Sequence, residues 1–264
     1  MLNQHPSVFE ELKKVDALVD ARNEPEMVTE RLPFTVRVVR SEEDILKAVA
    51  VRHSAYARHV PDYGETLRDP EASDRRPGAV VLLAASKIDG SPLGTMRIQT
   101  NAFEPLTLEQ SIDLPPHMKN ASLAAATRLG VVGAKIGTLA KMVLFKSYFL
   151  YCEAAGIEWM VVAARSPLDR QYERLMFTDV DPSLGYIQLH HGSTIPHRIM
   201  CCEPATARAR WRAANHPMYD FMVQTLHPDI DLGVPMAPRA SIPASTPPTR
   251  HPERPGVGSL HTLS

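Results

Sequence analysis

Two arginines of this chain lie inside apolar stretches that are typical of β-strands, where an arginine can take part in chemistry. Arg97 lies between Met96 and Ile98, and Arg128 lies within the small, apolar run 122–132. A guanidinium group on a pocket wall can hold a carboxylate through two parallel hydrogen bonds. A plainer interpretation stays open for Arg97, because alternate side chains of a strand point to opposite faces and this one can point into water.

The polar segment 61–78, between a predicted helix and a predicted strand, supplies the acids that these arginines could meet. It contains proline and the acidic residues Asp62, Glu65, Asp69, Glu71 and Asp74. An irregular polar segment in such a place can be a lid or a substrate loop. A solvated surface loop has the same composition, and a purely structural ion pair between Arg128 and Asp69 or Asp74 is an equal alternative.

The segment that must position these groups is 121–165. It predicts a strand over 122–132, a glycine-marked turn, a helix from Thr138 to Gly156 and a continuous apolar strand over 157–164. Such an order makes a right-handed β-α-β unit with two parallel strands. The start of the helix, reached through glycines, suits an anionic or thioester-bearing ligand.

The rest of the pattern predicts an α/β chain. A strand over 34–40 precedes a helix that starts at Ser41 and ends near 59–61, and Asp89-Gly90 joins the strands 79–86 and 93–99 in a hairpin. A long connection over 100–120 carries one short helix around Leu108. The predicted elements that follow the β-α-β unit are a short helix over 168–177, a hairpin of 186–190 with 195–203, and a last helix over 206–226.

Three regions follow from the composition along the chain. We expect an N-terminal amphipathic helical extension over 1–33, one α/β domain over 34–232, and a disordered tail over 233–264, where seven prolines lie among few apolar residues.

The bulk properties exclude several classes of function. The net charge of -1 gives no field that would attract nucleic acid or an anionic membrane. No apolar run is long enough to span a membrane. The 3 cysteines include an adjacent pair, show no metal-ligand spacing and favour a reducing cytoplasm. We therefore expect a cytoplasmic protein with no metal site.

The order of elements, together with five short motifs, resembles the GNAT acyl-CoA N-acyltransferase superfamily. Within it the chain is similar to the FeeM-type long-chain N-acyl amino acid synthases and, more distantly, to LuxI-type acyl-homoserine lactone synthases. The stretches that carry the resemblance are Arg52–Tyr56, the acids Asp69 and Asp74, Gly94–Ile98, Ala125–Leu129 and Ser166–Tyr172. The resemblance covers roughly 34–224 and implies a three-layer fold, a mixed central sheet flanked by helices.

The resemblance also implies a function and a site. The chain would transfer a long acyl group from acyl carrier protein, or from acyl-CoA, to the amine of an amino acid, with no bound cofactor. Asp69, Asp74, Arg97 and Arg128 would be catalytic. The two acids would hold the amine and, secondarily, take its proton, and the two arginines would fix a carboxylate of the acceptor or support the acidic loop. The residues expected to bind the substrates are Arg52, Tyr56, Thr127, Leu129, Met142, Phe145 and Trp159.

Two positions depart from the family pattern and leave alternatives open. Ala125 stands where the family usually has a glutamate, the candidate general base, and Asp169 replaces a histidine. A catalytically silent relative that binds acyl ligands or a partner fits these changes, and a lactone synthase that uses S-adenosylmethionine is a further alternative. An apolar stripe such as the one with Met142 and Phe145 is more often an ordinary core than an acyl tunnel.

Overall fold

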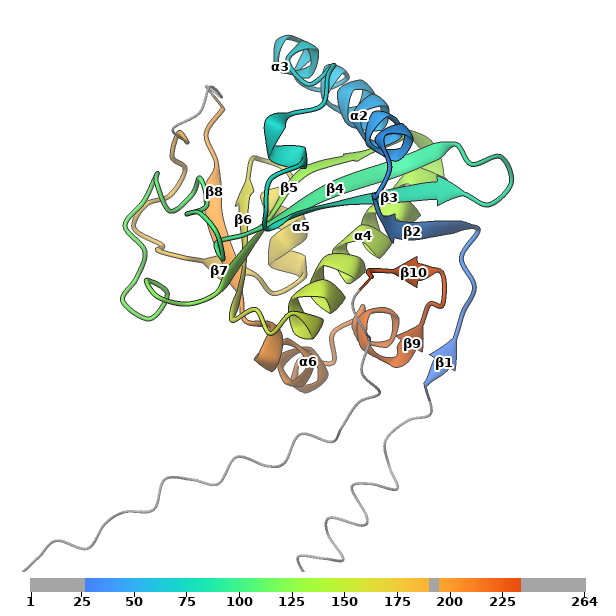
Figure 1. Cartoon of the computed structure of the whole chain (residues 1–264). Coiled ribbons are helices and arrows are strands. Elements are labelled where there is room, and N and C mark those ends of the chain that lie inside the picture. Colours follow the sequence, from blue (N-terminus) through green and yellow to red (C-terminus); the bar gives the residue numbers. More distant parts are fainter. Residues whose placement is uncertain (1–26, 190–194, 234–264) are drawn as a thin grey trace, which may run out of the picture.

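A mixed sheet of eight strands, with helices on both faces, forms the body of the protein (Figure 1). The computed structural model describes residues 27–189 and 195–233. The α-helices are α2 (Glu42–Ala57), α3 (Pro61–Glu65), α4 (Ala134–Ala154), α5 (Asp169–Arg174) and α6 (Pro204–Ala213), with the 3-10 turn η1 (Ala72–Asp74) and the π-helical turn η2 (Asp220–Gln224). The strands are β1 (Val28–Thr29), β2 (Phe34–Val38), β3 (Ala79–Ser86), β4 (Pro92–Thr100), β5 (Leu123–Val131), β6 (Trp159–Ala164), β7 (Thr178–Asp179), β8 (Arg198–Cys202), β9 (Thr225–Leu226) and β10 (Ile230–Asp231).

The sheet has the strand order β10-β2-β3-β4-β5-β6-β8-β7, and its centre is the predicted β-α-β unit. The β5–β6 and β10–β2 pairs are parallel, and the remaining pairs of this sheet are antiparallel. The β5–β6 register runs from Leu123 opposite Trp159 to Ala126 opposite Val162 and then stops. Beyond it β5 stays with β4 and β6 stays with β8, so the two central strands part at their carboxyl ends.

Helix α4 covers one face of the sheet and buries its apolar stripe there. Val143, Leu144, Tyr148 and Phe149 lie in the main hydrophobic cluster with alternate residues of β3 to β6. The helix begins at Ala134, one turn before the predicted start. Gly137 makes this possible, because a Cβ on it would lie 1.9 Å from the carbonyl oxygen of Val132.

The opposite face is covered by α2 and by the connection 101–121. Ile45, Ala48 and Val49 of α2 pack on β3, while the connection packs on β5, β6 and β8 as a second apolar cluster. Ser41 caps α2 as predicted, since its side chain accepts a hydrogen bond from the Asp44 N–H. The predicted helix around Leu108 is wrong, because the connection forms turns there.

The last elements differ from the prediction in pairing and in length. Strand β8 pairs with β6 and with β7, and the predicted partner segment contributes only a bridge between Ile187 and His197. Helix α6 ends at Ala213 instead of continuing to 226. Asn215 is left-handed with φ 45, and the proline at 217 cannot continue a helix, so the chain turns into η2.

Val28 and Thr29 pair with β9 and Leu32 is buried, so residues before 34 already pack on the domain that was predicted to begin there. The predicted amphipathic helix over 7–23, the loop that contains His190 and His191, and nearly all of the predicted tail lie outside the described residues. Within the described residues, no helix combines the length and the apolar character needed to cross a membrane.

Candidate active site

The strands β4 and β5 bring two of the predicted arginines to one place. Arg97 lies opposite Thr127 in the β4–β5 ladder, and its Nε donates to the Thr127 hydroxyl at 3.2 Å. The ladder shifts register between Thr95 and Arg97, and Arg128 takes up the irregularity with a left-handed φ of 54. This bulge turns the Arg128 side chain toward the loop before β3.

The loop before β3 presents its acids through the turn η1. Glu71 caps this turn: its backbone N–H donates to the Asp74 carboxylate at 2.8 Å, and its side chain accepts from the backbone of residue 74. The reciprocal bonds of this capping box direct Glu71 and Asp74, three residues apart, to the same side.

Three arginines and two acids form one network, which we call the arginine cluster: Arg52, Arg97, Arg128, Glu71 and Asp74. Arg52, Arg97 and Asp74 are buried, and Arg128 and Glu71 are half-buried. Arg52 binds both Asp74 oxygens at 2.8 Å, and Arg97 donates to Asp74 at 3.0 Å and to Glu71 at 3.1 Å. Arg128 holds Glu71 with two bonds of 2.7 Å. Three guanidinium groups face two carboxylates, so the cluster carries an excess of one positive charge.

The charges of the cluster shift the pKa values of its acids downward. Burial alone would raise the pKa of Asp74, but the hydrogen bonds and charge of Arg52, together with Arg97, outweigh it and hold the pKa at about 2. Burial alone would likewise raise the pKa of Glu71, but the hydrogen bonds and charge of Arg128 and the charges of Arg97 and Arg52 outweigh it and lower the pKa. Both acids are therefore ionised near neutral pH and are weak proton acceptors.

Aromatic rings connect the cluster with the surface. The Arg128 guanidinium lies over the Tyr63 ring, 5.6 Å from its centroid, and Tyr63 lies 5.8 Å from Tyr56. Burial raises the pKa of Tyr56, so its hydroxyl stays protonated.

A cavity of about 330 Å³ opens next to the cluster, where β5 and β6 part. Its walls come from α2, the end of β5, α4, and the segment between β6 and α5. The lining residues are Ala55, Tyr56, Arg58, His59, Leu129, Gly130, Val131, Lys141, Arg165, Pro167, Leu168 and Gln171. The charged side chains among them are all basic, so the cavity suits a ligand with both an apolar and an anionic part.

The structure brings most of the predicted site residues together, with one exchange. Asp74, Arg97, Arg128 and Arg52 form the cluster, Thr127 contacts Arg97, and Tyr56 and Leu129 line the cavity. Asp69, in contrast, is exposed and lies outside the cluster, and Glu71 takes the place expected for it. Glu71 was recognised in the sequence among the acids of this segment but was not predicted for the site, because no local pattern distinguishes it from Asp69.

Met142, Phe145 and Trp159, which the sequence predicted to bind the substrates, do not line one common slot. Phe145 is 3% exposed and packs on Tyr172 within the main cluster under α4. Trp159 belongs to the cluster on the opposite face of the sheet, where it contacts His117. Alternate residues of β6 point to opposite faces, which separates Trp159 from the α4 side chains.

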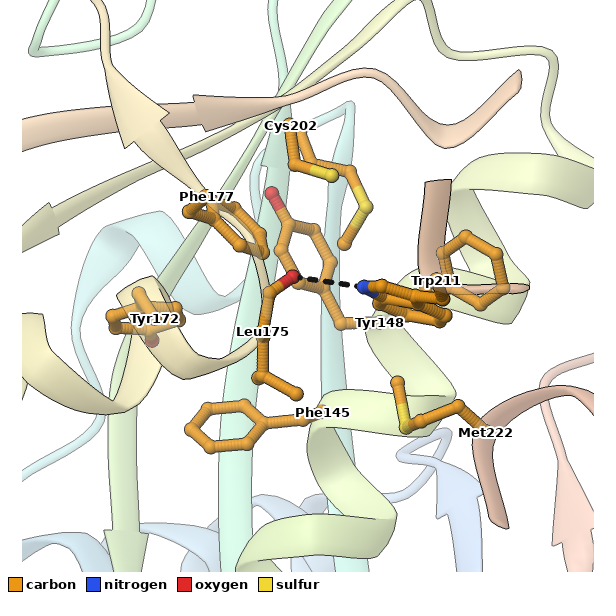
Figure 2. Close-up of a pocket in the computed structure, with 10 residues that line it drawn as sticks. Phe145, Tyr148, Tyr172, Leu175, Phe177, Cys202, Trp211 and Met222 are labelled. Atoms are coloured by element: carbon orange, nitrogen blue, oxygen red, sulfur yellow. Dashed lines mark hydrogen bonds between the residues drawn. The ribbon is translucent and has the colours of Figure 1, made fainter. Parts of the chain in front are cut away.

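The space beside Phe145 is a gap in the core. Figure 2 shows it enclosed by Phe145, Tyr148, Tyr172, Phe177 and Trp211, and its volume is about 10 Å³. That is room for about one water molecule, far below the size of an acyl chain. The cavity at the parting strands is thus the better candidate for a substrate site.

Three further basic residues at this cavity were missed in the sequence: Arg58, Lys141 and Arg165. Arg58 donates to the Val131 carbonyl at 2.5 Å and so holds the end of β5. Burial lowers the pKa of Lys141. No group of three or more His, Cys, Asp or Glu side chains that could hold a metal ion occurs in the described part of the chain.

Comparison of the whole fold with solved structures places the chain among acyltransferase-like folds. It superposes on FeeM, an N-acyl amino acid synthase from uncultured soil microbes, with a TM-score of 0.53 and 14% identity over 72% of this chain and 97% of that one. The predicted three-layer α/β fold is confirmed by this match and by the topology of the sheet. At this identity the match shows the fold alone.

Weaker likenesses carry no argument about function. An acyl-CoA N-acyltransferase from Pseudomonas aeruginosa has a TM-score of 0.44 and 15% identity over 64% of this chain and 97% of that one. The CoA-dependent acyl-homoserine lactone synthase BjaI with SAM and isopentyl-CoA has a TM-score of 0.45 and 15% identity over 74% of this chain and 94% of that one. No protein-family model and no curated protein sequence matches the chain.

Proposed function

We propose that the protein is an N-acyltransferase that moves a long-chain acyl group from a thioester donor, acyl carrier protein or acyl-CoA, to the amine of an amino acid. The observation that carries the proposal is the position of the arginine cluster. It lies where β5 and β6 part, next to a cavity whose charged lining is basic. The fold shared with an N-acyl amino acid synthase adds support.

The cavity suits the donor because both donors carry the acyl group on a phosphopantetheine arm. Arg58, Lys141 and Arg165 would meet the phosphate, and Leu129, Val131 and Leu168 would contact the apolar part of the arm. Helix α4 begins nearby at Ala134, with Gly133 as its N-cap, without a side-chain cap and without an acid in its first turn. The positive end of the helix dipole then adds to the attraction.

The arginine cluster suits the acceptor. Its excess positive charge would be balanced by the carboxylate of an amino acid, while Glu71 and Asp74 keep the three guanidinium groups in place. The acids thus serve to position the arginines. This differs from the expectation from the sequence, in which Asp74 first holds the acceptor's amine and secondarily takes its proton. An acid with a pKa of about 2 is a weak base toward an ammonium group.

The reaction needs few groups from the protein. The neutral amine attacks the thioester carbonyl carbon, backbone N–H groups of β5 beyond Ala126 stabilise the oxyanion, and the carbon–sulfur bond breaks. The ammonium proton leaves to water, and the thiolate gains a proton. A free α-amino group has a pKa of about 8, so turnover should rise with pH up to that value.

The test is direct. Purified protein is incubated with a long-chain acyl-carrier thioester and a mixture of amino acids, and with acyl-CoA in a parallel reaction, and products are identified by mass spectrometry. We expect an N-acyl amino acid that depends on Arg128, so that Arg128→Gln lowers kcat/KM by at least a hundredfold. The exposed pair on α2 provides the control variant Lys47→Gln, which should act as wild type. Absence of product from every donor would refute the proposal.

One observation favours a second candidate, a protein that binds acyl ligands without turnover. Ala125 is 5% exposed and lies in an apolar cluster under the connection 101–121. A substrate therefore does not reach the position where the resemblance would place the general base. Calorimetric binding of an acyl donor together with no product in the assay above would support this candidate.

A further inference from the structure

A buried lysine of α4 holds a segment near the end of the described chain. This segment, residues 220–232, contains η2, β9 and β10, and we call it the C-terminal strap (Figure 1). Lys146 is 2% exposed, and its Nζ donates to the Phe221 carbonyl at 2.6 Å and to the Thr225 carbonyl at 2.5 Å. Its third contact is Nδ1 of His227 at 2.9 Å. One ammonium group therefore fixes the strap to α4 at three points.

These contacts decide the protonation state of His227. An ammonium group has three N–H donors and no acceptor, so Nδ1 of His227 must offer a lone pair to Lys146. The single proton of the ring then lies on Nε2, which is 3.8 Å from the Glu30 carboxylate, beyond hydrogen-bond distance. A protonated ring carries N–H on both nitrogens. His227, which is 3% exposed, therefore binds Lys146 only as the neutral ring.

The charged groups around His227 oppose one another, and those that disfavour its protonation prevail. Burial and the charge of Lys146 lower the pKa of His227 below its ordinary value of 6.5. The carboxylates of Glu30 and Asp229 act in the opposite direction. Glu30 is mostly exposed, and Asp229 is already paired with Lys87 at 2.7 Å. Neither acid therefore compensates a second buried cation.

The pairing of the strap with the rest of the protein is short. β9 and β10 are each two residues long, and β10 lies at the edge of the main sheet beside β2. The Glu30 N–H donates to the Leu226 carbonyl, and the Val36 N–H donates to the Asp229 carbonyl, each at 2.9 Å. Short edge elements open at a lower free energy than the centre of a sheet. A contact that depends on protonation can therefore change how often the strap opens.

We propose that His227 is a proton sensor that releases the C-terminal strap from α4 when the pH falls. Protonation at Nδ1 places an N–H against the Lys146 ammonium, so the contact at 2.9 Å becomes a repulsion between two buried cations. The strap then opens, and β10 separates from β2. This inference does not depend on the proposed acyl-transfer function, because it involves no residue of the cavity or of the arginine cluster.

The protonation state of His227 can be measured directly. A group whose pKa is lower in the folded protein stabilises the fold fully above its ordinary value and less as the pH falls, so the strap is held above about pH 6.5. Long-range ¹H–¹⁵N spectra of histidine-labelled protein at about pH 7.5 should show the His227 proton on Nε2. Its titration midpoint should lie below about 6.5. A proton on Nδ1, or a midpoint at or above that value, overturns the proposal.

Amide hydrogen exchange measures the release itself. The reporters are the N–H groups of Glu30 and Val36, which bond to strap carbonyls, and the internal control is the Thr100 N–H, which donates to the Gly78 carbonyl at 2.9 Å. From about pH 7.5 to about pH 5.5, the protection of both reporters, corrected for the intrinsic rate, should fall about five- to tenfold, because the opened strap lets His227 bind a proton. Unchanged protection of the reporters, or an equal fall at Thr100, overturns the proposal.

His227→Asn is the matched variant. Its amide oxygen can accept from Lys146 but gains no proton in this pH range, so the protection of the two reporters should be the same at both pH values. His117→Asn, at an exposed histidine, should behave as wild type. A fall that persists in His227→Asn would belong to another group and overturns the proposal. If His227→Asn does not fold, the titration and the exchange of the wild type still decide.

Discussion

At the scale of single residues, the site depends on which charged groups share low-dielectric space. Arg52 is 2% exposed and is neutralised mainly by Asp74, which is itself 6% exposed. Removing one partner of such a pair leaves a buried, uncompensated charge, which costs far more than the net value of the pair. The exposed Asp69, a few residues away, has no such role.

The Asp74→Asn variant tests this difference. It keeps the shape of the side chain but removes the charge that Arg52 and Arg97 share, so the free energy of unfolding should fall by about 3 kcal/mol. Asp69→Asn should change it by less than about 0.5 kcal/mol. Urea unfolding of both variants measures the difference. Similar stabilities would show that the cluster does not hold the loop to the sheet.

Ala125 offers a second residue-scale prediction. The resemblance drawn from the sequence implied that a glutamate at this position would supply a base, but the alanine side chain lies in the apolar cluster with Leu106, Met118 and Val161. An ionised carboxylate there would be desolvated without a partner, so Ala125→Glu should lower the free energy of unfolding by about 2–4 kcal/mol without a gain in rate. Thermal unfolding and the acyl-transfer assay check both parts. A variant of wild-type stability with faster turnover contradicts the prediction.

At the scale of elements, the site exists because α2 lies directly on β5. A Cβ on Gly130 would lie 3.0 Å from the Cα of Arg52 and 3.1 Å from the Cβ of Ala55. This close approach allows Arg52 to reach Asp74 while Tyr56, one residue after Ala55, lines the cavity. The contact between helix and strand thus joins the cluster to the cavity.

Gly130→Ala should separate these two elements. The added methyl group would contact the Arg52 backbone and the Ala55 side chain, neither of which can move away without moving the helix. We therefore expect a loss of about 1–3 kcal/mol in the free energy of unfolding and a smaller cavity. Gly133→Ala is the matched control, because a Cβ there meets nothing within 4 Å. Denaturant unfolding of the two variants measures their free energies of unfolding. A larger loss in Gly133→Ala than in Gly130→Ala would contradict this account of the packing.

At the scale of the whole molecule, buried charges tie distant parts of the chain to the sheet. The cluster joins the loop before β3 to β4 and β5. At the other end, Lys146 of α4 donates to the Phe221 and Thr225 carbonyls at 2.6 and 2.5 Å and contacts His227 at 2.9 Å. Burial, and then the charge of Arg208, lower the pKa of Lys146 to about 8. The stability of the protein is therefore linked to pH.

The acid side of this linkage has a definite sign. The folded-state pKa of Asp74 is about 2, below its ordinary value of 3.8, and that of Glu71 is also lowered. The stabilisation is complete above the ordinary values and is lost as the pH falls through about 2. We expect the free energy of unfolding to drop between about pH 4 and pH 2, and less steeply in Asp74→Asn. Unfolding curves across this range that coincide for the two proteins would contradict the linkage.

The order of elements and the central β-α-β unit were predictable from the sequence alone. Periodicity of apolar residues, the Ser41 cap and the Asp89-Gly90 turn are local signals, and the strand 79–86 follows them residue by residue. Arg97 and Arg128 were predicted as site residues from a local signal as well, because a charged residue inside an apolar strand can be recognised from the sequence alone. Local signals failed at α6, where a left-handed Asn215 ends the helix that periodicity would extend.

Only the tertiary structure decided which acid meets the arginines and where the cavity lies. In the sequence, Asp69, Glu71 and Asp74 are three acids of one polar segment, and nothing local distinguishes them. The η1 turn points Glu71 and Asp74 toward the arginines, and the bulge at Arg128 turns this arginine toward Glu71. Likewise Met142 and Trp159, both apolar, belong to opposite faces of the sheet. Side-chain direction at turns and bulges depends on contacts between segments far apart in the chain, and those contacts are not encoded in any local pattern.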